Sequence, residues 1–174
     1  MKEIHHTCRC TGQTFTFKEW CAYLKAHPDA REIVFTFGKF GWNIFDVCMN
    51  PNIPVKWCAG SYRFEIETAQ SPNGRWDNGY SCMFHTSGMS HGVSFVSRPN
   101  DGYPSEKDAI YDALCEMEKR CLREIEEAKG RIEYNDAGEP VNTSSIIPKL
   151  NKALDQLRKY KEAYDPVQLT LFEL

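Results

Sequence analysis

The amino-acid sequence predicts an α+β protein in which an antiparallel sheet is covered by a long helix. Apolar and polar residues alternate over residues 62–68, as they do along a strand with one buried face. A glycine-containing turn at residues 71–74 separates this segment from a second alternating one. Over residues 106–129, apolar residues recur every three or four positions, which is the spacing of a buried helix face. Helices on one face of an antiparallel sheet define the α+β class.

The segment before this sheet is predicted to contain a short helix and an N-terminal hairpin. Thr16 and Glu19 have the spacing of a capping box, so a helix begins directly after Thr16, and Pro28 ends it. Apolar residues alternate over 33–37, and a turn with two glycines leads to a returning strand over 42–47. The hairpin therefore adds strands to the antiparallel part of the fold.

Three strands make up the predicted central sheet. They are residues 62–68, 79–86 and 92–97. A glycine- and serine-rich connection over 87–90 joins the second strand to the third. Before the sheet, two prolines and two asparagines predict a loop over 50–54, and residues 55–58 form a short bridge from that loop into the first strand.

Two helices follow the sheet. Ser105 and Asp108 begin the long helix as a second capping box, and Gly130 stands where a helix commonly ends. The sheet residues expected beneath this helix are Phe64, Ile66, Phe84 and Phe95. Ser145 is expected to cap a last helix, which stops at residues 165–166 because proline cannot continue it.

Length and composition fit one principal domain. The chain has 174 residues, of which 41% are apolar, and this is enough for a packed core. We predict an α+β domain over residues 1–130 and, over 131–165, a loop and a C-terminal helix that packs on that domain. Residues 166–174 then form a short tail.

Charge and hydropathy reduce the number of function classes that fit the chain. A net charge of −3 and a pI near 6.0 give no general attraction to nucleic acid. The sequence has no apolar run long enough to cross a membrane, and the N-terminus lacks the hydrophobic segment of a signal peptide, so no membrane partner is expected. We therefore expect a cytoplasmic protein, in which the eight cysteines are reduced.

Two groups of residues have the chemistry of a site. His5, His6, Cys8 and Cys10 place four metal-ligand types within six residues. Their spacing lacks the two separated ligand pairs of common zinc modules, so the sequence predicts an exposed terminus and no metal. His85 and His91 flank a connection, but Cys82 points to the opposite sheet face from His85.

No grouping of nucleophile, base and orienting acid can be identified in the sequence. A glycine-rich phosphate loop is also lacking. We therefore expect a non-enzymatic protein without a cofactor, and an enzyme with an unrecognised site remains the alternative.

The tail carries the sharpest functional pattern. Its residues Gln168-Leu169-Thr170-Leu171-Phe172 resemble the short peptide by which bacterial replication and repair proteins bind the sliding clamp. The resemblance implies that the Gln168 amide hydrogen-bonds at the mouth of the clamp pocket. It also implies that Leu169, Leu171 and Phe172 fill the apolar cleft. Thr170 stands at the permissive position of the motif. The expected function is that of an accessory protein tethered to the clamp.

The same tail residues have an alternative interpretation. Leu169 to Phe172 have high strand propensity, so they could form an edge strand of the protein's own sheet. In that case the tail would stabilise the fold and would bind no partner.

Two looser resemblances concern the body of the chain. A helix, three strands and a capped helix resemble a double-stranded-RNA-binding domain, which implies a nucleic-acid-binding module. In the segment that would grip phosphates, Lys107 stands between Glu106 and Asp108, so the charge gives this module no support. Residues 76–113 also resemble small βββα domains of phage and plasmid proteins, which implies a mobile-element setting.

Overall fold

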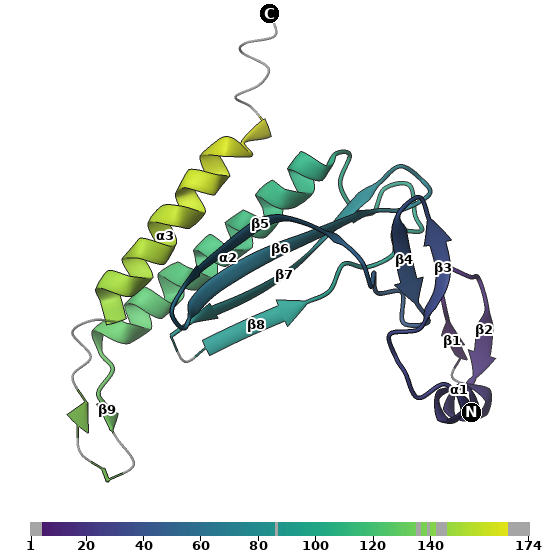
Figure 1. The fold of residues 1–174 in the computed structure, drawn as a ribbon, viewed down its shortest axis with the longest axis horizontal. Helices are drawn as coiled ribbons and strands as arrows, with labels where there is room; N and C mark the ends of the chain where they lie inside the picture. Colours follow the sequence, from purple (N-terminus) through teal and green to yellow (C-terminus); the bar gives the residue numbers. More distant parts are fainter. Residues whose placement is uncertain (1–4, 86, 135–136, 139, 142–145, 167–174) are drawn as a thin grey trace, which may run out of the picture.

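A computed structural model confirms the α+β class and describes residues 5–85, 87–134, 137–138, 140–141 and 146–166 (Figure 1). The strands are β1 (His5–Thr7), β2 (Thr14–Thr16), β3 (Ile33–Phe37), β4 (Phe40–Asn43), β5 (Asn52–Ala59), β6 (Tyr62–Gln70), β7 (Trp76–Phe84), β8 (Ser87–His91), β9 (Glu133–Tyr134) and β10 (Pro140–Val141). The helices are α1 (Phe17–Ala26), α2 (Glu106–Lys129) and α3 (Ile146–Ala163).

The central sheet has four antiparallel strands in the order β5-β6-β7-β8. β6 and β7 are its longest pair, and their register places Phe64 opposite Cys82 and Ile66 opposite Tyr80. Gly74 closes the turn between them with a φ of 79°, a backbone conformation that suits glycine. The residues of β6 alternate between buried and more accessible positions, as the sequence predicts.

Helices α2 and α3 lie side by side on one face of this sheet (Figure 1). α2 packs on β6 and β7, and α3 reaches β6, where Tyr160 meets Phe64 edge to face. Ser105 caps α2 by accepting a hydrogen bond from the Asp108 amide, which confirms the predicted start of this helix. The buried residues between helices and sheet form a first core that includes Phe64, Ile66, Phe84, Leu114, Met117, Leu150 and Leu157.

The N-terminal segments gather at the other end of the sheet (Figure 1). Thr16 and Glu19 form the predicted capping box at the start of α1, and β3 and β4 form the predicted hairpin. These elements pack together with the start of the chain and with residues near Ala69 and Val93, and enclose a second core. Its buried residues are Cys8, Cys10, Phe15, Phe40, Trp42, Ile44, Cys48, Ala69, Val93 and Phe95.

The third predicted strand, over residues 92–97, is wrong. The third strand of the hairpin series is β8 (Ser87–His91), and Val93 and Phe95 turn away into the second core. Their backbones form hydrogen bonds with the N-terminal part of the chain instead. The Cys48 amide donates to the Val93 carbonyl at 2.9 Å, and the Phe95 amide donates to the Asp46 carbonyl at 2.8 Å. Phe95 therefore does not lie beneath α2.

The loop and bridge predicted over residues 50–58 are also wrong, since most of this segment is strand β5. β5 is an edge strand and has a neighbouring strand on one side only. It therefore tolerates Pro54, which has no amide proton to donate. The register shifts between Asn52 and Val55, at the position of that proline.

The helix α3 ends at Ala163, close to the predicted stop. Ser145 and the tail residues 167–174 lie outside the described residues. The helix cap at Ser145 and the clamp-binding peptide therefore stay predictions. In the part of the chain that the structure describes, no helix is long and apolar enough to cross a membrane.

Candidate functional site

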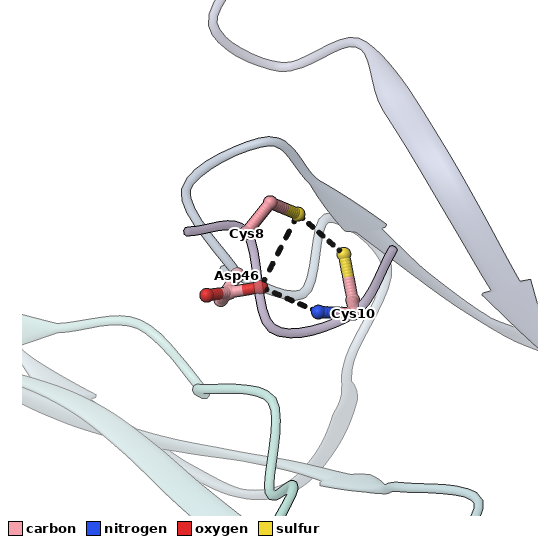
Figure 2. A group of neighbouring side chains, drawn as sticks. All are labelled: Cys8, Cys10 and Asp46. Carbon is pink, nitrogen blue, oxygen red and sulfur yellow. Dashed lines mark hydrogen bonds between the residues drawn. The ribbon is translucent and has the colours of Figure 1, made fainter. Parts of the chain in front are cut away.

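Three potential metal ligands converge in the second core: the Cys8 thiol, the Cys10 thiol and the Asp46 carboxylate (Figure 2). Their ligand atoms all lie within 4.8 Å of one another. The two sulfur atoms are 3.1 Å apart, and the Cys8 Sγ lies 3.5 Å from the Asp46 Oδ1. The three residues are 0%, 8% and 4% exposed. This group, which we call the thiol–carboxylate group, is the candidate site.

A tight turn between β1 and β2 brings the two thiols together. The Gly12 amide donates to the Cys8 carbonyl at 2.9 Å, and the Cys8 amide donates to the Gln13 carbonyl at 2.9 Å. Gly12 has a φ of 72°, so the turn needs a residue that tolerates the left-handed region. The turn directs the side chains of Cys8 and Cys10 toward each other, although they are separated by only one residue.

Asp46 reaches the turn from the loop after β4. This residue has a φ of 63°, which few residues other than glycine, asparagine and aspartate adopt. The Asn43 side chain holds the loop, because its Oδ1 accepts hydrogen bonds from the Phe45 and Val47 amides, each at 3.0 Å. The Asp46 amide itself donates to the Asn43 carbonyl at 3.0 Å. The carboxylate is therefore fixed in place by its own loop.

The carboxylate accepts hydrogen bonds from the turn that it faces. Its Oδ1 accepts from the Cys10 amide at 2.9 Å, and its Oδ2 accepts from both the Arg9 amide and the Arg9 Nε at 3.0 Å. Burial alone would raise the pKa of Asp46, but these hydrogen bonds and the Arg9 charge hold it below its ordinary value. Asp46 is therefore ionised at neutral pH.

The Cys10 thiol has the opposite electrostatic environment. Burial raises the pKa of the Cys10 thiol well above its ordinary value, and the neighbouring Cys8 and Asp46 raise it further. Without a bound cation, Cys10 is thus a protonated thiol and a poor nucleophile. This environment does not activate Cys10 for covalent catalysis, whereas thiolate and carboxylate ligands do suit a metal ion.

The structure divides the predicted cluster of four metal-ligand residues. Cys8 and Cys10 belong to the thiol–carboxylate group, and Asp46 completes it in place of the two histidines. His6 stacks on Trp20 with ring centroids 3.8 Å apart, and His5 is exposed in β1.

The sequence does not reveal Asp46 as a partner of the cysteines, because it predicts one continuous strand over residues 42–47. β4 ends at Asn43, and the chain turns before Asp46. Asparagine and aspartate three residues apart favour such a turn, so this pair was the available signal.

The other histidine pair does not form a site with Cys82. The Nδ1 of His85 lies 3.2 Å from the Tyr62 hydroxyl oxygen. The His91 ring packs edge to face on Tyr80. Cys82 is buried in the first core under the helices. These contacts explain the histidines as parts of the hairpin that contains β7 and β8.

The open face of the sheet, opposite α2 and α3, bears on the nucleic-acid alternative. On this face, the described residues of β6 include Arg63, Glu65 and Glu67. The β7 residues that pair with them include Ser81 and Met83. These charges are mixed and these residues include no aromatic ring, whereas surfaces for single strands use basic charge and aromatic stacking.

The helix layout also departs from the double-stranded-RNA-binding domain. α1 packs against β1 and β2 at the far end of the molecule, and both α2 and α3 cover the sheet. The Nζ of Lys107, which would be the phosphate contact, donates to the Asp165 carbonyl at 2.8 Å.

Comparisons of the chain with protein-family models, with curated proteins and with solved structures find no significant match. The fold and the site therefore define the class only as an α+β protein with a buried thiol–carboxylate group. Function must be inferred from the chemistry of this chain.

Proposed function

We propose that this chain is a non-enzymatic accessory protein of a bacterium or mobile element that is tethered to the replication sliding clamp by residues 168–172. One observation carries the proposal: Gln168, Leu169, Leu171 and Phe172 match all four specified positions of the clamp-binding peptide. Such a peptide needs no folded partner domain of its own, because it brings its anchors into a preformed apolar pocket.

The size of the anchors sets the expected affinity. Leu169, Leu171 and Phe172 each gain about 1.5–3 kcal/mol when fully buried. Ordering a free peptide offsets part of this gain. A dissociation constant in the micromolar range, about −8 kcal/mol, is the expected scale.

The described residues form a core and a sheet among themselves. Among the described residues, the first core is built from residues between Val55 and Leu157, and the sheet β5-β6-β7-β8 is formed by residues 52–91. Lys107 binds the Asp165 carbonyl, so the chain is attached to the start of α2 directly before the tail. We therefore expect the domain to keep its stability when residues 167–174 are removed.

The first prediction tests the tether directly. A synthetic peptide of residues 165–174 should bind purified bacterial clamp in a calorimetric titration, because the motif carries its own anchors. Replacing Leu171 and Phe172 together with alanine should abolish binding, since these side chains provide most of the buried apolar area. Thr170→Ala is the matched control and should bind like the original peptide.

The edge-strand alternative predicts the opposite pattern. In that case the peptide would not bind the clamp, and the Leu171→Ala, Phe172→Ala double variant of the whole protein would melt at a lower temperature. This combination would disprove the tether, whereas binding by the peptide with an unchanged melting temperature would support it.

A further inference from the structure

We infer that the thiol–carboxylate group of Cys8, Cys10 and Asp46 is a binding site for one divalent metal ion of the zinc type. The site lies in the second core, and the proposal is independent of the tail. It rests on the convergence of three buried donor atoms, on the positioning of the carboxylate and on the charge balance of the group.

The donor set selects the class of metal. Zinc is bound by cysteine thiolates, by histidine and by carboxylate oxygens, and thiolates favour zinc over magnesium or calcium. The Sγ of Cys8, the Sγ of Cys10 and the Oδ1 of Asp46 already share one small volume. They supply three ligands of a tetrahedral site and leave the fourth position to a water molecule or another small ligand.

The geometry needs only a small adjustment. With zinc–sulfur bonds of about 2.3 Å, two sulfurs of a tetrahedral site lie about 3.8 Å apart. The sulfurs of Cys8 and Cys10 are 3.1 Å apart, so modest rotations of these side chains would open the site. The carboxylate is already oriented by the Arg9 and Cys10 amides, in the way that outer hydrogen bonds orient a metal ligand.

The charges balance when an ion is bound. Two thiolates and one carboxylate carry three negative charges, while a divalent ion and the Arg9 guanidinium supply three positive ones. Arg9 is in place, since its Nε lies 3.0 Å from the Asp46 Oδ2. The ion, its three ligands and the half-exposed Arg9 side chain would then be neutral overall.

The site would also join two parts of the chain. Cys8 and Cys10 come from the turn between β1 and β2, and Asp46 comes from the loop after β4. Residues of both hairpins line the second core, so an ion held by both parts would stabilise the folded arrangement of this core. A bound ion would therefore link the turn after β1 to the loop after β4, and its open fourth position distinguishes the site from a closed, four-ligand zinc module.

The experiment titrates Zn²⁺ into the full, reduced chain in competition with a chromophoric chelator. One ion should bind per chain, and Cys8→Ser, Cys10→Ser and Asp46→Asn should each weaken binding at least about tenfold. Cys48→Ser is the matched control, because Cys48 is a buried cysteine of the same core outside the thiol–carboxylate group. It should bind zinc like the native chain.

A second measurement does not depend on whether the variants fold. Co²⁺ added to the native chain should give the charge-transfer absorption of cobalt–thiolate bonds and the strong visible bands of a tetrahedral ion. Absence of one-to-one binding would overturn the proposal, as would a cobalt spectrum without thiolate bands or equal losses in the Cys48→Ser control. A chain with a Cys8–Cys10 disulfide that binds no zinc after reduction would also overturn it, and would identify a redox pair instead.

Discussion

At the residue scale, Gly79 shows how the lack of a side chain at one position allows the chain to leave the sheet. A Cβ atom at this position would lie 2.6 Å from the Val93 amide nitrogen and 2.8 Å from the His91 carbonyl oxygen. The backbone after β8 can therefore cross β7 closely and enter the second core only because residue 79 has no side chain.

The second prediction follows from this contact. Gly79→Ala should lower the free energy of unfolding by about 1–3 kcal/mol, because the clashing atoms belong to the backbone and cannot rotate away. Gly130→Ala is the matched control, since a Cβ there meets nothing within 4 Å. Urea denaturation of both variants measures the difference, and equal midpoints would show that the crossing is looser than described.

The missed residue of the site belongs to the same scale. The cysteine pair is visible in the sequence, but Asp46 lies 36 residues after Cys10, and only the folded loop brings it there. The apolar residues Trp42, Ile44 and Val47 suggest a returning strand and so conceal the turn. Long-range partners of this kind are set by the tertiary fold, which local periodicity does not contain.

At the element scale, sequence periodicity located the strongest elements and missed the weak ones. The alternation in β6, the apolar period and N-cap of α2 and the capping box of α1 are clear in the sequence, and the structure confirms them. β8 consists of Ser-Gly-Met-Ser-His, which has little strand propensity of its own, and it is a strand because β7 provides a ladder. The prolines and asparagines of residues 50–54 predict a loop where β5 begins, but an edge strand tolerates the proline that β5 contains.

The interface between α2 and α3 gives the third prediction. Glu118 on α2 accepts hydrogen bonds from Lys161 at 2.7 Å and from Arg158 at 2.9 Å, both on α3. These bonds, that from Lys161 foremost, hold the pKa of Glu118 below its ordinary value despite partial burial. A lowered pKa means that this carboxylate stabilises the fold above its unfolded pKa of about 4.3, and that the contribution is lost as pH falls through the folded pKa.

Glu118→Gln should therefore cost about 0.5–1 kcal/mol at pH 7, the range for a partly exposed ion-pair network. The difference from the native chain should shrink as the pH falls below about 4. Glu162→Gln, at an exposed position beside the same interface, is the control. Denaturation of both proteins at pH 7 and at a pH below about 4 tests the prediction. A stability difference that grows in acid would contradict it.

At the scale of the whole molecule, the two proposed activities lie in different parts of the fold. The tail follows α3, which belongs to the first core, whereas the thiol–carboxylate group belongs to the second core. Variants of Cys8, Cys10 or Asp46 should therefore leave clamp binding by residues 168–172 unchanged. Variants of the tail should likewise leave zinc binding unchanged, so each proposal can fail without the other.

The two separate cores also determine how the protein opens. Units with short strands and few buried contacts exchange their amide protons through local opening at a lower free energy than global unfolding. α1 has no buried residue, and β1 and β2 have three residues each, whereas β6, β7 and α2 surround the first core. In native-state hydrogen exchange, the amides of residues 5–50 should exchange as one early cooperative unit, while those of β6 and α2 persist. A zinc ion at Cys8, Cys10 and Asp46 should slow exchange in the early unit alone.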